Sequence, residues 1–316
     1  MPRPLSSKVA LVAGATRGAG RGIARALGEA GATVYCTGRS TRARLAGSRP
    51  ETIDETAELV TAAGGHGIAV RVDHTVPHEV AALVARIERE QSRLDVLVND
   101  VWGGDELTQF GTPFWELSLE QGRTMLERAV FSHIVTARHA TPLLVASGGG
   151  LIVEITDGDN FQYRGNLFYD LVKTSVIRLA FAYARELRRK GVTAVAVTPG
   201  FLRSEAMLDR FGVTEATWRD AGQQDPNFLA SETPLFVGRA IAALAADPEV
   251  HRKNGRVLAS WTLSDEYDFT DADGARPHWG RHFEQAYGKD IVKSCDQGFY
   301  EYWQGGVMDT LFGEWP

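Results

Sequence analysis

The sequence predicts an α/β fold: a doubly wound parallel sheet of about seven strands with helices on both faces. Three observations predict this fold. Short runs rich in β-branched residues alternate with longer amphipathic stretches, a glycine-rich turn joins the first run to the first amphipathic stretch, and 44% of the 316 residues are hydrophobic. Parallel strands joined by right-handed helical crossovers explain the alternation, and they place a ligand at the carboxyl ends of the strands.

The alternation continues from the amino terminus to about residue 260. Short apolar or β-branched runs predict strands at Val9–Ala13, Thr33–Thr37, Ile68–Val72, Leu94–Val98, Leu151–Thr156, Thr193–Val197 and Arg256–Ser260. Amphipathic stretches predict helices at Arg21–Ala30, Glu51–Ala62, Glu79–Glu90, Glu120–Ala146, Tyr169–Lys190 and Pro234–Ala246. We therefore expect one domain over residues 1–260.

Residues 261–316 form a tail with many aromatic side chains and no periodic pattern. Its rings are Trp279, Phe283, Tyr287, Tyr300, Tyr302, Trp303, Phe312 and Trp315, among others. Because rings of this size bury a large apolar area, we expect the extension to pack on the domain or on a neighbouring subunit.

Composition excludes several kinds of partner. A formal net charge of −6 and a pI near 5.8 give no basic footprint for nucleic acid. Val9–Ala13 is too short for a signal or membrane segment, and no other window offers one. Cys36 and Cys295 lack metal-ligand spacing, which favours a reduced, cytoplasmic setting. His278 and His282 have no third ligand nearby, so no metal is expected.

A glycine-rich run, Ala13-Gly14-Ala15-Thr16-Arg17-Gly18-Ala19-Gly20, leaves the first strand and opens the first helix. Glycine lets the backbone turn tightly and approach a pyrophosphate, whose charge the helix amino terminus stabilises. The alternative is a helix start that needs glycine for packing alone. The placement between strand and helix favours a dinucleotide-binding (Rossmann) fold, with the cofactor held by Gly14, Thr16, Arg17, Gly18 and Gly20.

The end of the second strand favours NADP(H) as that dinucleotide. It reads Cys36-Thr37-Gly38-Arg39-Ser40, and no carboxylate follows before Glu51. NAD-binding chains usually have an Asp or Glu here for the ribose hydroxyls. Arg39, with Arg17 and Ser40, suits a 2′-phosphate instead, through charge-assisted hydrogen bonds. The alternative is that these arginines belong to a solvated loop.

Tyr169 and Lys173 lie four residues apart on a predicted helix and therefore share one face. A phenol ordinarily loses its proton near pH 10, so a nearby cation is needed for acid or base catalysis at neutral pH. Lys173 supplies such a cation. The spacing alone is weak, because any Tyr and Lys four apart on a helix match it.

Five motifs together resemble the short-chain dehydrogenase/reductase family over roughly Lys8 to Leu258. They are the Gly-x-x-x-Gly-x-Gly run, Asp73 after the third strand, Leu94-Asp95-Val96-Leu97-Val98-Asn99, the Tyr-x-x-x-Lys pair, and Pro199-Gly200 followed by Ser204. The resemblance implies that Asp73 caps the adenine ring, that Asn99 lies in the cofactor site, and that Pro199, Gly200 and Ser204 cover the nicotinamide.

The resemblance also implies a reaction. Hydride passes between NADP(H) and a small carbonyl or alcohol compound, Tyr169 exchanges the proton on the oxygen, and Lys173 lowers the phenol pKa and binds the nicotinamide ribose. Family members commonly form homodimers or homotetramers, with the helices Glu120–Ala146 and Tyr169–Lys190 at the interface.

One departure concerns the serine that the family usually places after the fifth strand. Counting back from Tyr169 puts Thr156 at that position, whereas counting along the strand puts Asp157 there. An ionised Asp157 would repel a developing oxyanion unless it were protonated or faced a basic substrate group. Two alternatives follow: imine reduction or dehydration that uses Asp157, or an aspartate that merely caps the next turn.

Two further departures alter the neighbourhood of the pair. The family's helical Asn is replaced by Arg128 or Ala129, with Ser132 or His133 one turn later. The expected Asn-Asn-Ala-Gly is replaced by Asn99-Asp100-Val101-Trp102-Gly103-Gly104. These losses leave open a non-catalytic sensor or scaffold that binds NADPH.

Substrate shape depends on loops that the fold leaves free. Residues 201–230 are expected to form a lid over the nicotinamide end. Aromatic and apolar walls are expected from Trp102, Phe161, Tyr163, Phe201 and Met207.

Overall fold

The computed structural model describes residues 3–159 and 163–288, and this part of the chain folds around one parallel seven-stranded sheet. The strands are β1 (Val9–Ala13), β2 (Thr33–Gly38), β3 (His66–Arg71), β4 (Val96–Asn99), β5 (Gly150–Ile155), β6 (Val192–Thr198) and β7 (Val257–Ala259). Their order is β3-β2-β1-β4-β5-β6-β7. The doubly wound α/β fold predicted from the sequence is confirmed.

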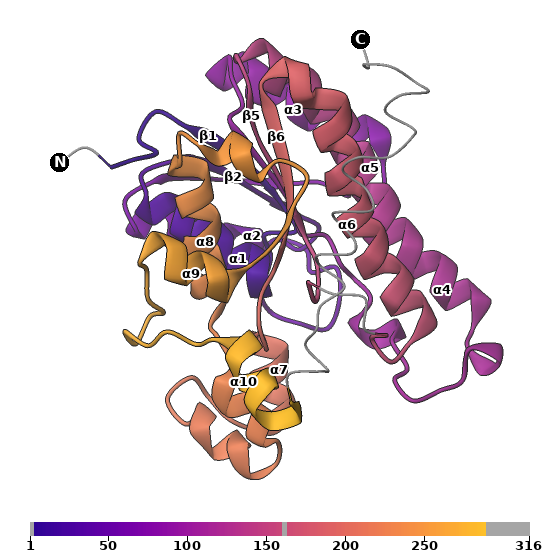
Figure 1. Ribbon diagram of the computed structural model, residues 1–316. Coiled ribbons are helices and arrows are strands. Elements are labelled where there is room, and N and C mark those ends of the chain that lie inside the picture. The colour runs from indigo at the N-terminus through magenta and orange to yellow at the C-terminus, as the bar shows by residue number, and fades with distance from the viewer. Residues whose placement is uncertain (1–2, 160–162, 289–316) are drawn as a thin grey trace, which may run out of the picture.

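Helices cover both faces of the sheet, as Figure 1 shows. Helices α1 (Gly18–Glu29), α2 (Ile53–Ala62), α8 (Pro234–Ala246) and α9 (Ser260–Tyr267) lie on one face, and α3 (Pro77–Gln91), α5 (Ser132–Ala146) and α6 (Leu167–Leu187) lie on the other. The remaining α-helices are α4 (Leu119–Leu126), α7 (Glu205–Phe211) and α10 (Trp279–Tyr287). Short 3-10 turns occur at Asp105–Leu107, Phe114–Glu116, Arg188–Lys190, Trp218–Gln223, Pro226–Ala230 and Val250–Lys253.

The core consists of two apolar layers that the sheet separates. Along β1, Val9 and Leu11 enter the layer under α3 and α5, whereas Ala10 and Val12 enter the layer under α1 and α8. All four side chains are buried. Because strand side chains alternate between faces, a strand buried on both faces is apolar throughout, which is why β1 reads as a continuous apolar run.

The sheet reverses its winding between β1 and β4, and this position organises the ligand site. Ala13 pairs with Thr37 on one side and with Asn99 on the other. The glycine run, the end of β2 and the end of β4 therefore meet at one edge of the sheet. In doubly wound sheets, ligands bind at such a reversal.

The predicted helix over Glu120–Ala146 forms, but a π-helical segment breaks its regular α-helical pattern. Helix α4 passes into a π-helical segment, Glu127–Phe131, before α5 begins. Within this break the Ser132 hydroxyl donates to the Arg128 carbonyl at 2.5 Å. A serine that bonds the backbone four residues earlier competes with the regular ladder and bends a helix. Single π turns often occur at functional sites.

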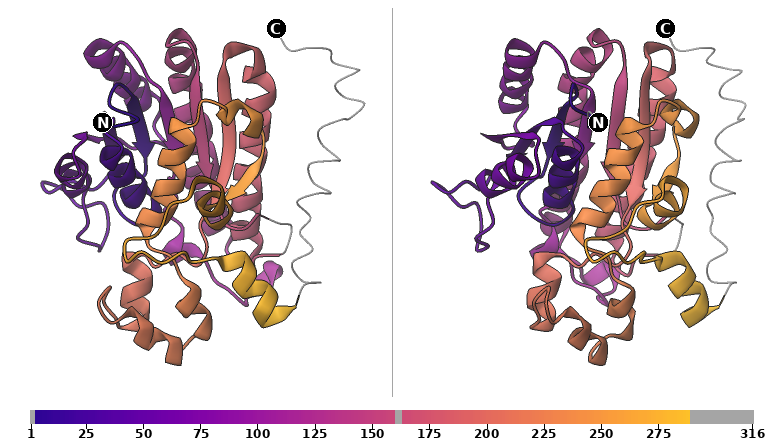
Figure 2. Two further views of the ribbon diagram at one scale, coloured as in Figure 1. Left: turned by 60° about the vertical axis from the view of Figure 1, so that its left-hand side comes forward. Right: turned by 90° about the vertical axis from the view of Figure 1, so that its left-hand side faces the viewer.

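The described part of the C-terminal tail is more regular than predicted. Trp261 and Leu263 of α9 are buried in the domain, so the core continues past residue 260. Helix α10 lies against the turn Pro226–Ala230, and Figure 2 shows both at the end of the molecule where α7 lies. The aromatic residues Tyr300, Tyr302, Trp303, Phe312 and Trp315 lie outside the described residues.

Residues 201–230 form a small layer with its own apolar centre. Trp218, Ala221 and Phe228 are buried there, and Met207 and Phe211 pack against them. This layer lies beyond the carboxyl ends of the strands (Figure 1). Among the described residues no helix combines the length and apolar character needed to span a membrane.

Candidate active site

Two glycines of the run, Gly14 and Gly20, pack too tightly against the backbone to carry side chains. Gly14 has a φ of +92°, and a Cβ there would lie 2.5 Å from the carbonyl oxygen of Asp100. A Cβ on Gly20 would lie 2.3 Å from the Gly14 carbonyl oxygen. Both contacts are too short for carbon, so glycine is required at both positions. Arg17 adopts the extended cap position that precedes α1.

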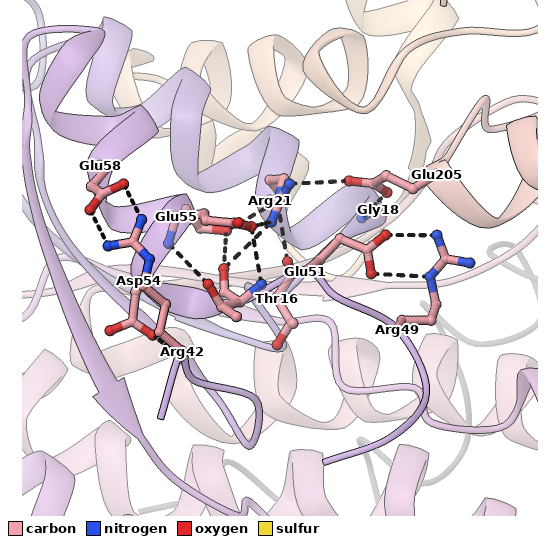
Figure 3. A network of polar contacts seen from close by, with 12 residues as sticks. Thr16, Gly18, Arg21, Arg42, Arg49, Glu51, Asp54, Glu55, Glu58 and Glu205 are labelled. Carbon is pink, nitrogen blue, oxygen red and sulfur yellow. Dashed lines mark hydrogen bonds and ion pairs between the residues drawn. The ribbon is translucent and has the colours of Figure 1, made fainter. Parts of the chain in front are cut away.

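A carboxylate already lies at the start of α1. The backbone N–H of Gly18 donates to Oε2 of Glu205 at 2.8 Å, and Arg21 Nη1 lies 3.8 Å from Oε1 (Figure 3). Glu205 is the first residue of α7, whose cap is Ser204. Arg21 also binds the Glu55 carboxylate at 2.8 Å and, through Nε, the Thr16 carbonyl at 3.2 Å. The amino terminus of α1 therefore holds an anion supplied by the chain itself.

The loop after β2 carries Arg39 and Ser40, and Arg39 lies close to Asp73 of the loop after β3. Arg39 is half exposed, and its Nη1 lies 3.8 Å from Oδ2 of Asp73. Asp73 accepts from the Thr75 hydroxyl at 2.7 Å, and burial opposes the hydrogen bonds that hold its pKa below the usual range. The Ser40 hydroxyl is buried and accepts from Ala46 N at 3.0 Å. Arg39 and Ser40 are both predicted to bind the 2′-phosphate, and of these two side chains the arginine is the more accessible.

Glu51, the first carboxylate after Arg39, is neutralised within the same loop. Arg49 donates two hydrogen bonds to the Glu51 carboxylate, of 2.7 and 3.1 Å (Figure 3). Arg49 Nη1 also reaches Asp209 of α7 at 2.9 Å. Helix α7 therefore contacts the glycine run through Glu205 and the loop after β2 through Asp209.

Asp157, and not Thr156, lies beside the phenol of Tyr169. The Tyr169 hydroxyl donates to Oδ2 of Asp157 at 2.7 Å. The Thr156 hydroxyl instead donates to the Lys173 carbonyl at 2.8 Å. The strand decides the register, because Thr156 N still bonds the Val197 carbonyl, at 3.0 Å, and Asp157 is the first residue beyond that ladder. Burial and the Asp157 carboxylate raise the pKa of Tyr169 well above 10, so the phenol is held protonated.

Lys173 lies in the same site. Its ammonium is 4.7 Å from the centre of the Trp102 ring and 5.5 Å from that of Tyr169. Burial lowers the pKa of Lys173, and the carboxylates of Asp157 and Asp100 oppose that shift. The lysine and the tyrosine are therefore together, as the spacing predicts, but a carboxylate is added to the pair.

A buried polar chain lies where the family has its helical Asn. Glu154 is fully buried in β5; its two oxygens bind the Asn99 side-chain amide at 2.7 Å and His133 Nδ1 at 2.6 Å. His133 Nε2 lies 3.0 Å from the Val101 carbonyl, and Arg128 binds the Gly103 carbonyl at 2.9 Å. These contacts fix the loop after β4. A glutamate inside an otherwise apolar strand was the signal in the sequence, and it was missed.

The loop Pro199-Gly200 is held by a second glutamate that sequence reasoning missed. Glu232 is 1% exposed; its Oε2 accepts from Gly200 N at 2.9 Å and from the Ser260 hydroxyl at 2.6 Å. Burial raises the pKa of Glu232 to about 8. A buried, hydrogen-bonded carboxyl group therefore holds the Pro199-Gly200 loop in place.

The predicted pocket residues divide into two groups. Trp102 stacks edge-to-face on Tyr169 at 5.3 Å, and Phe110, which was not predicted, does so at 5.5 Å. Phe201 packs on Phe228 and Trp279, and Met207 packs beside them, so both belong to the interior of the layer 201–230. Tyr163 is 63% exposed, and Phe161 lies outside the described residues.

A parallel sheet that reverses at a glycine cradle, with a tyrosine and a lysine at its carboxyl edge, defines a nucleotide-dependent oxidoreductase of the short-chain class. The family model for short chain dehydrogenases matches residues 8–211. The chain belongs to the short-chain dehydrogenase/reductase family.

Relatives with similar sequences cover most of the chain. Dehydrogenase/reductase SDR family member 1 of Mus musculus is 35% identical over 87% of this chain and 86% of its own length. The Homo sapiens protein of the same name is 34% identical, with the same coverage.

Solved structures agree in fold. A short chain dehydrogenase from Mycobacterium thermoresistibile superposes with a TM-score of 0.71 at 21% identity, covering 87% of this chain and 92% of that one. A Beutenbergia cavernae protein, assigned provisionally as an NAD(P)-dependent gluconate 5-dehydrogenase, has a TM-score of 0.66 at 26% identity. It covers 82% of this chain and 97% of its own, and its structure holds NADP at low occupancy.

Proposed function

We propose that this protein is an NADP(H)-dependent oxidoreductase that transfers a hydride between the nicotinamide and a small carbonyl or alcohol compound. The observation that carries the proposal is the meeting of Tyr169 and Lys173 at the carboxyl edge of the sheet, with the lysine ammonium 5.5 Å from the phenol ring. Tyr169 acts as the proton donor and acceptor, and Lys173 tunes it.

The residues at the sheet reversal are suited to a dinucleotide. Gly14 and Gly20 let the chain's own backbone approach closely enough to form a tight turn, and the N–H of Gly18 binds the Glu205 carboxylate at 2.8 Å. A pyrophosphate presents the same negative charge to such a helix terminus. When bound, NADP(H) supplies or accepts the hydride. The chain orients the substrate, excludes water and holds a proton on the Tyr169 hydroxyl.

The phosphorylated form of the cofactor is favoured by Arg39. Its contact with Asp73 is long, at 3.8 Å, so the guanidinium is available to a 2′-phosphate. Glu51, which would compete for ribose hydroxyls or repel a phosphate, is bound by Arg49 at 2.7 Å. NADP in the Beutenbergia cavernae structure is consistent with this choice.

The contact between Tyr169 and Asp157 favours a second acceptor, a C=N double bond. A carboxylate 2.7 Å from the phenol opposes the build-up of negative charge on a carbonyl oxygen. The same carboxylate stabilises a positively charged nitrogen.

The test is turnover by the purified protein with NADPH and a panel of ketones, aldehydes, quinones and cyclic imines, followed by cofactor absorbance. The Tyr169→Phe variant should lose about 10²- to 10⁴-fold of the wild-type kcat, the usual value of a positioned general acid. Its NADPH affinity should stay near wild type. Tight NADPH binding by the wild type without turnover on any class would favour a sensor or scaffold instead.

A further inference from the structure

Asp157 gives the reacting site a charge that ordinary ketone reduction does not use. It stands first after β5, and Oδ2 accepts the Tyr169 hydroxyl at 2.7 Å. In that arrangement the phenol proton already points to the carboxylate. To be reduced, a ketone would have to take this proton from the phenol while its oxygen gains negative charge beside Asp157. The repulsion between the two negative charges raises the activation barrier of ketone reduction.

Acidic side chains outnumber the Lys173 ammonium around the phenol. Two more carboxylates, Asp100 and Asp105, act on Lys173 together with Asp157. Asp105 accepts from Trp102 Nε1 at 2.6 Å, which places it beside the ring that Lys173 covers. Lys173 thus faces three acidic side chains.

Arg164 is a second cation near the phenol, and its charge partly opposes the rise in the pKa of Tyr169. Its Nη1 binds the Asp170 carboxylate at 3.0 Å, and its Nε binds the backbone carbonyl of Asp157 at 2.5 Å. The guanidinium is therefore directed at another carboxylate and at the main chain. The site beside Tyr169 therefore has an acidic side chain, Asp157, that can bind a cation.

Aromatic rings at the same place also suit a cation. Trp102 and Phe110 lie edge-on to Tyr169, with ring centres 5.3 and 5.5 Å away, and Phe110 is 58% exposed. Ring faces attract ammonium and iminium groups, and the attraction grows as water is excluded. The Lys173 ammonium already covers the face of Trp102, 4.7 Å from the ring centre, so Phe110 is the ring left for a substrate cation, and the Asp157 carboxylate carries the inference.

We propose that the substrate of this site carries a protonated nitrogen at the reacting carbon, as in a cyclic iminium ion, and that Asp157 recognises it. The inference rests on the hydride transfer proposed above and changes the group that receives the hydride and, with it, the role of Tyr169. The iminium N–H donates to Asp157 in a charge-assisted hydrogen bond, and the carboxylate favours the protonated form of the imine.

The reaction balances without a proton from Tyr169. The iminium carbon accepts a hydride from the reduced nicotinamide, a new C–H bond forms, and the C=N π pair becomes the lone pair of the product nitrogen. Reduced nicotinamide is oxidised, and a neutral amine is released. Tyr169 then serves as a positioning residue that holds Asp157, which matches a phenol whose proton is already donated to that carboxylate.

The test compares 3,4-dihydroisoquinoline with 1-tetralone, because the imine and the ketone share one fused-ring skeleton. With NADPH, the wild type should prefer the imine in kcat/KM. Asp157→Ser restores the family's usual residue; it should lower the imine value by about 10- to 100-fold, the worth of a hydrogen bond to a charged group, and raise the ketone value. Asp157→Asn, the neutral isostere, should lower the imine value without a comparable gain for the ketone.

A binding measurement decides the proposal independently of turnover. The tetrahydroisoquinolinium cation, titrated calorimetrically into wild type with NADP⁺, should bind about tenfold more tightly than into Asp157→Asn. Equal binding by both folded proteins, or a wild type that prefers 1-tetralone, would overturn the role of Asp157. NADPH binding with no turnover of either compound by wild type or Asp157→Ser would instead refute hydride transfer itself, while the amine titration still judges Asp157.

Discussion

At the scale of single residues, the choice of cofactor depends chiefly on Arg39. Its side chain is 39% exposed, and its ion pair with Asp73 spans 3.8 Å. Replacing Arg39 with Asp removes the cation and adds an anion where the 2′-phosphate would lie. The ratio of the NADPH to the NADH dissociation constant should rise about 10- to 100-fold, because charge-assisted hydrogen bonds have this strength. Fluorescence titration of both cofactors measures it.

The matched control for Arg39 is Arg44→Asp, which makes the same charge change in the same loop at an exposed position. Screening by solvent should limit its effect on NADPH. An unchanged preference in Arg39→Asp, or an equal change in both variants, would contradict the assignment of NADP(H).

At the scale of secondary structure, α7 links the layer 201–230 to the glycine run. Its Glu205 carboxylate binds Gly18 N at 2.8 Å, so an incoming pyrophosphate meets a negative charge at the helix terminus (Figure 3). Replacing Glu205 with Gln should tighten NADP⁺ binding by about two- to fivefold, the usual worth of one charge at a helix terminus. The affinity of 2′-AMP, which lacks the pyrophosphate, should change little. Calorimetric titration measures both.

Asp209→Asn provides the control on the same helix. Asp209 binds Arg49 at 2.9 Å, and among the described residues it forms no hydrogen bond with Gly18. The Asp209→Asn substitution removes an equal charge from α7 and leaves the contact with the glycine run intact. Weaker NADP⁺ binding in Glu205→Gln would show that the glutamate supports the cofactor and does not compete with it.

How far the sequence predicts each element depends on how local its cause is. Strand β1 matches its predicted range because its apolar run and the following glycine are both local signals. Strand β3 begins earlier than predicted, at His66, because its limits are set by pairing with Thr33 of β2. The break between α4 and α5 has no strong local signal, since a serine such as Ser132 is compatible with a continuous helix.

The candidate site follows the same rule. The glycine run, Tyr169 and Lys173 could be predicted because each lies in one short segment. The choice between Thr156 and Asp157 could not, because it depends on the pairing of β5 with β6. The contact of Glu205 with Gly18 joins residues 187 positions apart, and no spacing within one segment encodes it.

At the scale of the whole molecule, the helices over one face of the sheet leave apolar side chains in solvent. Phe131 is 52% exposed, Leu171 44% and Ile134 37%. They lie on the π segment, α6 and α5, where the family resemblance places a subunit interface. Single exposed apolar residues are ordinary, but a group on neighbouring helices marks an interaction surface. We propose that a second copy of the chain covers it.

Phe131→Glu tests that proposal, because a charge in the centre of such a contact would have to be buried without a partner. Light scattering after size exclusion should give a multiple of 34.5 kDa for the wild type and a shift to 34.5 kDa for the variant. Leu45→Glu is the control: Leu45 is 47% exposed on the loop after β2, and its variant should keep the wild-type mass. A monomeric wild type would contradict the interface. Since Phe131 lies in the same π segment as Arg128, which holds the loop after β4, loss of the partner should also lower turnover.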